Sequence, residues 1–200
     1  MCGPVHAEPA GEGRERRADH DRDPIAAPLG LPLAGPIELD ANVTIPLLEL
    51  RPAPRYTSGR VAVRCVGRCR LGDDRTPAVG LDGPLADGGA FSHVDLDGLD
   101  AQLVIRRGVA RLTRWTLPSP EVETAVGLEV RLASDPGASA LAGCVRYRPT
   151  AALAARDPRL HALAIQAGAA VADGWYALRI DGTVDAPQLV AAPCEPATGG

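Results

Sequence analysis

The clearest pattern in the chain lies at Glu121–Leu132, where apolar and polar residues alternate. Side chains of a β-strand point alternately to the two faces of a sheet. The pattern therefore predicts a long strand with one buried and one solvated face. Such a strand needs long neighbours and an apolar partner layer. The residues of the predicted buried face are Val122, Thr124, Val126, Leu128, Val130 and Leu132.

Six further stretches have strand character and are separated by turn signals. The clearest turns are Arg107–Gly108 and Ser134–Gly137, because glycine, proline and aspartate favour turn conformations. Strands joined by short turns pair in antiparallel fashion. We therefore predict a mainly β fold of long antiparallel strands in one curved, trough-like sheet. The other predicted strands are Ile37–Leu47, Gly59–Cys69, Leu99–Ile105, Val109–Leu117, Ala140–Arg148 and Trp175–Ile180.

One or two short helices are predicted near residues 150–172. Thr150–Ala155 is a short helical run, and Asp157 followed by Pro158 is typical of an N-cap and a first helical position. Apolar residues then recur at helical spacing, and the helix is expected to end before Gly174. Its small aliphatic stripe suits packing against the sheet.

The pattern divides the chain into three parts. Residues 1–34 mix charges, proline and glycine without an apolar period, which predicts a disordered or linker tail. Residues 35–190 carry the predicted strands and helices and form a single β-rich domain, long enough to bury a core. Residues 191–200 are expected to be a frayed C-terminal tail.

Composition argues against several functional classes. All 21 basic residues are arginine, so the chain has no lysine for a Walker A loop, a Schiff base or a Ser-Lys dyad. A net charge of −4 and 3% aromatic residues argue against a nucleic-acid partner. The chain has no nucleophile elbow, nucleotide-binding glycine fingerprint or His-Glu-x-x-His motif. We expect a protein that is not an enzyme and uses no cofactor.

Histidines and acidic residues form no pattern that predicts a metal or catalytic site. No two of the four histidines have metal-ligand spacing on one element. Asp95, Asp97 and Asp100 are clustered, but they do not match a calcium loop and are expected to be solvated turn residues. The acids of the central strand are expected to form its solvated face. They are Glu121, Glu123 and Glu129.

The cysteines leave three interpretations open. Two disulfides and one leftover thiol would fit an oxidising compartment. Cys65 and Cys69 could instead supply half of a zinc site that Cys144 and Cys194 complete. Buried cysteines can also act simply as small hydrophobic residues. The fifth cysteine, Cys2, lies in the N-terminal tail.

No stretch approaches the ~18 consecutive apolar residues of a membrane helix. The first residues are too polar for the apolar core of a signal peptide. We therefore expect either a cytoplasmic protein or a sequence that lacks an upstream targeting segment.

Three stretches together resemble the N component of type II (general) secretion pathways. They are CVGRCRLGDD at Cys65–Asp74, the strand-turn-strand run at Phe91–Leu132, and DGWYALRIDGTVDAPQL at Asp173–Leu189. The order of these stretches covers about residues 35–190 and carries the resemblance.

The resemblance implies a periplasmic domain of the AsmA-like superfamily, built as a trough of long strands with an apolar inside. It implies association with the inner membrane through a segment not present in this sequence, and partners among other secretion-system proteins. It carries no catalytic residues. In the periplasm, we expect the pairs Cys65–Cys69 and Cys144–Cys194 to be disulfides.

Two functions follow from this resemblance. The first is a non-enzymatic accessory component of a type II protein secretion system that acts through protein contacts. The alternative is a lipid-binding or lipid-transfer module that uses an apolar groove. The expected groove residues are Val43, Ile45, Val122, Val126, Leu128, Val130, Leu132, Leu178 and Ile180.

Overall fold

The protein is dominated by one antiparallel sheet in a computed structural model that describes residues 33–72 and 93–196. Its strands are β1 (Leu33–Ala34), β2 (Ile37–Thr44), β3 (Leu47–Leu48), β4 (Arg51–Pro52), β5 (Ser58–Leu71), β6 (Val94–Arg106), β7 (Val109–Thr116), β8 (Val122–Arg131), β9 (Ala140–Pro149), β10 (Ala169–Ala170), β11 (Tyr176–Gly182) and β12 (Pro187–Ala191). The helices are α1 (Ala151–Arg156) and α2 (Pro158–Ala167). The predicted fold class, a curved, mainly β sheet with two short helices, is confirmed.

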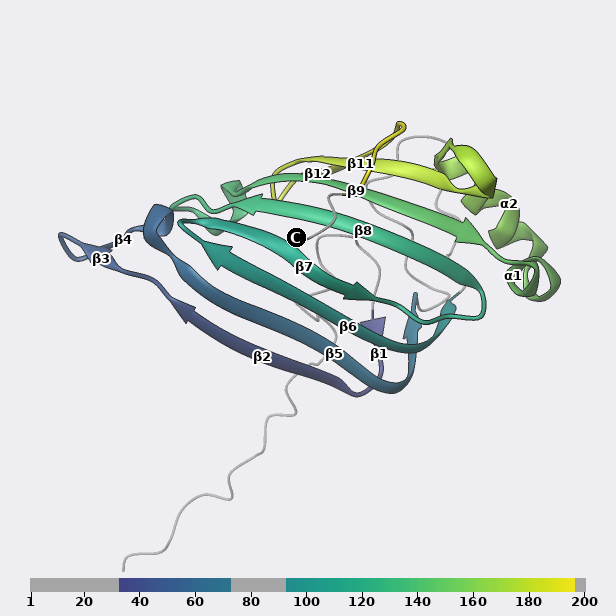
Figure 1. Ribbon diagram of the computed structural model, residues 1–200, viewed down its shortest axis with the longest axis horizontal. Coiled ribbons are helices and arrows are strands. Elements are labelled where there is room, and N and C mark those ends of the chain that lie inside the picture. The colour runs from purple at the N-terminus through teal and green to yellow at the C-terminus, as the bar shows by residue number, and fades with distance from the viewer. Residues whose placement is uncertain (1–32, 73–92, 197–200) are drawn as a thin grey trace, which may run out of the picture.

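The sheet is open, with an edge on each side (Figure 1). Its central order is β5–β6–β7–β8–β9–β11. Strands β1 and β2 both pair with β5 and form one edge, while β10 and β12 both pair with β11 and form the other. Strands β3 and β4 form a separate hairpin at the end of the molecule opposite the helices (Figure 1). The sequence did not predict β12, since Trp175–Ile180 was the last strand expected.

The register separates an apolar from a polar face. Residues directly paired across antiparallel strands share a face, so the pairs Val126–Val145 and Val145–Leu178 place three strands' apolar residues on one side. The apolar face also includes Val63 of β5 and Leu103 of β6. The polar face carries Glu38, Asp40, Arg60, Arg64, Asp100, Arg111, Glu123, Glu129, Arg131, Arg146, Arg148, Arg179 and Asp181.

Helix α2 packs on the apolar face at one end of the sheet. The Tyr147 hydroxyl donates a hydrogen bond of 2.7 Å to the carbonyl of Ala164. The ring of Tyr147 stacks on Tyr176, with centroids 5.9 Å apart. A Cβ at Gly168, which follows the helix, would lie 2.6 Å from the Tyr147 oxygen, so only glycine fits there. Burial raises the pKa of Tyr147 to about 12, and the neighbouring Tyr176 adds to the shift.

The best-packed cluster lies where β5 bends. The pairing of β5 with β6 shifts by one residue between Val66 and Cys69, which is a bulge. The bend brings the Cα atoms of Cys65 and Cys69 to 6.5 Å, and the two cysteines form a disulfide. Gly35 lies so close to it that a Cβ would be 2.9 Å from the Cys69 sulfur. The disulfide and Leu96 form a buried core cluster.

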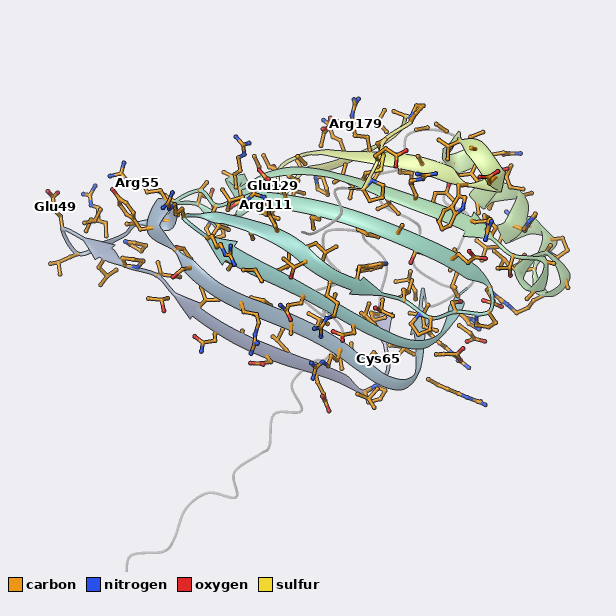
Figure 2. All side chains as sticks on the ribbon, viewed as in Figure 1. Glu49, Arg55, Cys65, Arg111, Glu129 and Arg179 are labelled. Atoms are coloured by element: carbon orange, nitrogen blue, oxygen red, sulfur yellow. A yellow bond between two sulfur atoms is a disulfide. The ribbon has the colours of Figure 1, made fainter. Side chains whose placement is uncertain are left out.

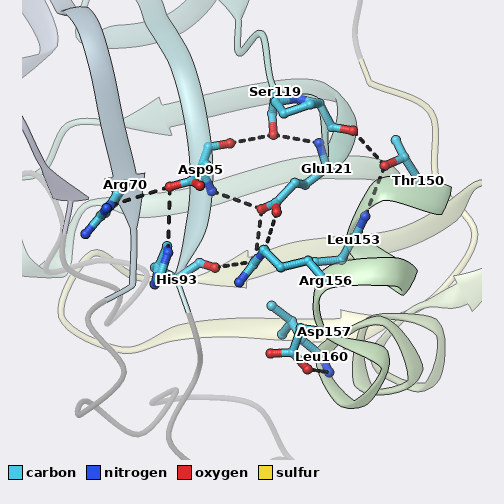
Figure 3. A network of polar contacts seen from close by, with 11 residues as sticks. Arg70, His93, Asp95, Ser119, Glu121, Thr150, Leu153, Arg156, Asp157 and Leu160 are labelled. Atoms are coloured by element: carbon cyan, nitrogen blue, oxygen red, sulfur yellow. Dashed lines mark hydrogen bonds and ion pairs between the residues drawn. The ribbon is translucent and has the colours of Figure 1, made fainter.

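An ion pair between a buried carboxylate and a more exposed arginine joins this end of the sheet to α1 (Figure 3). The side chain of Glu121 is only 6% exposed and is held by the guanidinium of Arg156. The second oxygen of Glu121 also accepts a hydrogen bond of 3.0 Å from the amide of Asp95. Arg156 donates a further bond of 2.6 Å to the carbonyl of His93. The ion pair raises the pKa of Arg156.

The expectation that Glu121 belongs to the solvated face is therefore wrong. Strand β8 begins one residue later, at Val122, and Glu121 turns inward to Arg156. The other two acids, Glu123 and Glu129, do lie on the polar face.

Both expected boundaries of the domain differ from the structure. Leu33 and Ala34, expected in the tail, already pair with β5, while residues 1–32 lie outside the described residues. The C-terminal segment is not frayed as far as residue 196. Ala191 belongs to β12, Cys194 is bonded to Cys144, and Glu195 pairs with Arg146 at 2.8 Å.

We expect Arg156→Ala to lower the free energy of unfolding by about 2–3 kcal/mol, because it leaves the Glu121 carboxylate buried without its cation. Chemical denaturation measures this cost. Arg159→Ala, on an exposed position of α2, is the matched control and should stay within about 0.5 kcal/mol of the wild type. Equal effects of the two substitutions would contradict the role of the ion pair.

We expect the stability of the protein to fall as the pH rises from about 10 to about 12. Tyr147 keeps its proton to a pKa of about 12 in the folded state, whereas an unfolded tyrosine loses it near pH 10. The unfolded state therefore releases a proton first, and unfolding is favoured in this window. Denaturation at several pH values should show a smaller slope for Tyr147→Phe. An unchanged slope would mean that another group controls this pH dependence.

Candidate functional site

The register brings most of the expected groove residues to one face of the sheet. Val43, four residues of β8 and two of β11 all lie on the apolar face. Ile180 is buried, but the β8 residues are only half-buried, and Val43 is exposed. The β8 and β11 residues are Val122, Val126, Leu128, Val130, Leu178 and Ile180.

Two of the expected groove residues lie outside the strands. Ile45 follows the end of β2 and is exposed. Leu132 follows β8, and its amide donates a hydrogen bond of 2.8 Å to the carbonyl of Gly108. The groove as a ligand site stays a prediction.

The edge formed by β2 is the most open part of the apolar face. Strand β2 pairs with β5 over eight residues, from Ile37 to Thr44. No described strand pairs with its other side. All its apolar residues except the half-buried Ile37 are exposed, with Leu39 at 59%. The edge therefore offers both unpaired backbone groups and apolar side chains, the two features that natural sheet edges usually hide.

The sequence could not identify this edge. The alternation at Ile37–Leu47 predicts an amphipathic strand, but nothing local says whether that strand is flanked on one side or on two. A strand's position in the sheet depends on pairing between distant segments. The exposed apolar residues of the neighbouring hairpin were missed for the same reason. They are Leu47, Leu48 and Leu50.

A hollow of about 650 Å³ lies over the middle of the sheet, mainly on its polar side. Its wall includes the segment around Cys194, which a disulfide holds to Cys144 of β9, with Cα atoms 5.8 Å apart. Strands β7 and β8 form the floor. The first three residues of β7 pair with the last three of β8, from Val109–Arg131 to Arg111–Glu129. Beyond these pairs the two strands separate.

Several charges around the hollow are compensated by neighbours, although Arg106, which also lines it, forms no ion pair with a described acidic residue. Glu129 lies between Arg111 and Arg131, at 2.9 and 3.0 Å (Figure 2). The hydrogen bond from Arg131, followed by that from Arg111, lowers the pKa of Glu129 against the opposing effect of burial. Arg179 pairs with Asp181 at 2.6 Å. The hollow thus lacks the concentrated single-sign charge that would select a charged small molecule.

The two disulfides expected for the periplasm are confirmed. Cys65 is bonded to Cys69 and Cys144 to Cys194. The alternative zinc site is wrong, because all four sulfurs are used in these two bonds. Among residues 33–72 and 93–196, no group of three or more histidine, cysteine or acidic side chains could hold a metal ion.

Two of the three clustered aspartates of β6 form ion pairs. Asp95 lies 3.5 Å from Arg70 and 3.7 Å from His93. Asp100 lies 3.3 Å from Arg114 and 3.8 Å from Arg64. These residues lie in β6, so the expected turn is wrong, whereas Asp95 and Asp97 are exposed to solvent as expected.

Comparisons with family models, with curated proteins and with solved structures find no match to this chain. No helix in the described parts of the chain is both long and apolar enough to span a membrane.

We expect the two disulfides to contribute unequally to stability. In the chain-entropy account, the 50-residue separation of Cys144 and Cys194 is worth about 4 kcal/mol, and the four-residue separation of Cys65 and Cys69 about 2 kcal/mol. The test compares the unfolding free energies of the double variants Cys144→Ala/Cys194→Ala and Cys65→Ala/Cys69→Ala. A negligible cost for the first variant would mean that the C-terminal segment is not held by this bond.

Proposed function

We propose that the chain is a non-enzymatic accessory component of a type II protein secretion system, and that it acts in the periplasm through protein contacts. The observation that carries the proposal is the open β2 edge with its exposed apolar side chains. An extended segment of a partner can add to such an edge as a further strand. Backbone hydrogen bonds then supply affinity, and side-chain pockets on alternate positions supply specificity.

The disulfides support the compartment in this proposal. Disulfides persist in oxidising surroundings such as the bacterial periplasm and are rare in the cytosol. The Cys65–Cys69 bond fixes the bend of β5. The Cys144–Cys194 bond attaches the C-terminal segment to β9. The resemblance of three sequence stretches to the secretion-pathway N component supplies the choice of system.

Leu39 gives a sharp test of the edge. Its side chain is exposed, so Leu39→Asp should cost little stability, yet a charge pointing over the apolar side of an edge strand opposes strand addition. Val66 is the matched control, because it has the same 59% exposure and lies in the bulge of β5. Both variants should melt close to the wild type.

In a strain without the gene, we expect folded exoproteins to accumulate in the periplasm instead of the medium. The wild-type gene and Val66→Asp should restore secretion, whereas Leu39→Asp should not. The measurement is the amount of each exoprotein in the medium and the periplasm. Normal secretion without the gene would contradict the proposal.

A lipid-binding module is the second candidate, and the half-buried apolar residues of β8 favour it. A surface that spans several long strands could lie along an acyl chain. The same deletion strain separates the two candidates, because this function predicts normal secretion with a leaky or lipid-altered envelope. Lipid that copurifies with the protein would add support for this second function.

A further inference from the structure

The β3–β4 hairpin carries an apolar tip that packs against nothing in the described structure. It projects from the end of the sheet, beyond the last residues of β2 (Figure 1). Leu47 and Leu48 lie on β3, and Leu50 lies in the turn with 91% of its surface exposed. Isolated apolar residues on a surface are ordinary, but several at the tip of one projection indicate a contact site.

The turn at the tip is conformationally unfavourable for its residues. Glu49 and Leu50 have φ values of +51° and +64°, so both central positions of the two-residue turn are left-handed. Turns of this kind usually contain Asn-Gly, because glycine has no steric cost at positive φ. A leucine there loses stability and also leaves its side chain in solvent. This combination indicates that the side chain has a use outside the folded domain.

The base of the hairpin is rigid. The amide of Ala53 donates a hydrogen bond of 2.8 Å to the carbonyl of Pro46, which closes the hairpin where it joins the sheet. The β6–β7 turn lies against this base: the amide of Gly108 bonds to the carbonyl of Thr57 at 3.0 Å. A Cβ at Gly108 would be 2.7 Å from the Cα of Arg55.

Arginines surround this base. Arg51 belongs to the hairpin and Arg55 to the turn after it (Figure 2 marks Arg55). Arg107 lies in the adjacent β6–β7 turn, and Arg106 is the last residue of β6. All four are exposed. No described acidic residue forms an ion pair with any of them. The hairpin tip carries one acidic residue, Glu49, so the tip and the four arginines together have a net positive charge.

We propose that this hairpin inserts its leucines into the surface of a bilayer that contains anionic phospholipids. Apolar residues at the tip and cations behind them match the order of acyl chains and phosphates at such a surface. Tyr56, at the base, has the amphipathic character that suits the interface, and the guanidinium of Arg55 lies 4.9 Å from the centre of its ring. A second copy of the chain or a groove on another protein would not require these four arginines behind the apolar tip.

Flotation with vesicles tests the proposal on the full chain. The wild type should bind vesicles of equimolar phosphatidylcholine and phosphatidylglycerol, bind pure phosphatidylcholine far less, and dissociate at high salt. Leu48→Asp/Leu50→Asp should weaken binding to the anionic vesicles at least about tenfold, because charged groups replace the inserted ones. Arg51→Ser/Arg107→Ser should also weaken it, by about thirtyfold, at roughly 1 kcal/mol per arginine.

Leu50→Gly separates loss of vesicle binding from loss of stability, because it should change the two in opposite directions. This variant should raise the melting temperature, because glycine relieves the left-handed position, and should still bind the anionic vesicles more weakly than the wild type. The proposal is overturned if the wild type does not bind anionic vesicles, or if the Leu48→Asp/Leu50→Asp variant binds them as well as the wild type.

Leu39→Asp separates this inference from the proposed function. It should leave vesicle binding unchanged, since Leu39 lies on the β2 edge and not at the hairpin tip. Loss of vesicle binding in Leu39→Asp, with binding intact in the tip variants, would assign the membrane contact to the apolar face and overturn the hairpin proposal.

Discussion

The structure depends on one constraint: each long strand has an apolar face, and no second sheet covers that face within residues 33–72 and 93–196. In most β domains two layers bury their apolar faces against each other. Here helix α2 covers one end, through Tyr147, while apolar residues such as Leu39 stay exposed at the other edge. The hydrophobic contribution to stability is therefore divided among local clusters, and much apolar surface is left over for contacts with other molecules.

Covalent and ionic links join the described elements around this one large sheet. The Cys65–Cys69 bond fixes the bend of β5, and the Cys144–Cys194 bond holds the C-terminal segment to the polar face. The Glu121–Arg156 pair joins the start of β8 to α1. Such links keep a single-layer sheet in shape without covering its apolar face. A protein built in this way can present a large apolar surface and an open strand edge while remaining folded.

Local sequence pattern predicts the strands and their faces here, because period-two alternation is a property of each segment alone. Strand β8 was expected within one residue at each end, and its apolar face is as predicted. Features set by distant segments were not predictable. Glu121 continues the alternation, yet it turns inward because Arg156, 35 residues away, meets it. The exposure of Leu39 depends on the position of β2 at an edge of the sheet. The exposure of Leu50 depends on the β3–β4 hairpin, whose strands are too short, at two residues each, to show an alternating pattern.

Amide hydrogen exchange of the free protein tests the open edge most directly. Strand β9 is paired on both sides, with β8 and β11, whereas β2 is paired only with β5. Residues 37–44 should therefore exchange much faster than residues 140–149, with alternate amides of β2 least protected. Equal, strong protection of both segments would mean that another part of the chain covers β2, and would contradict a binding edge there.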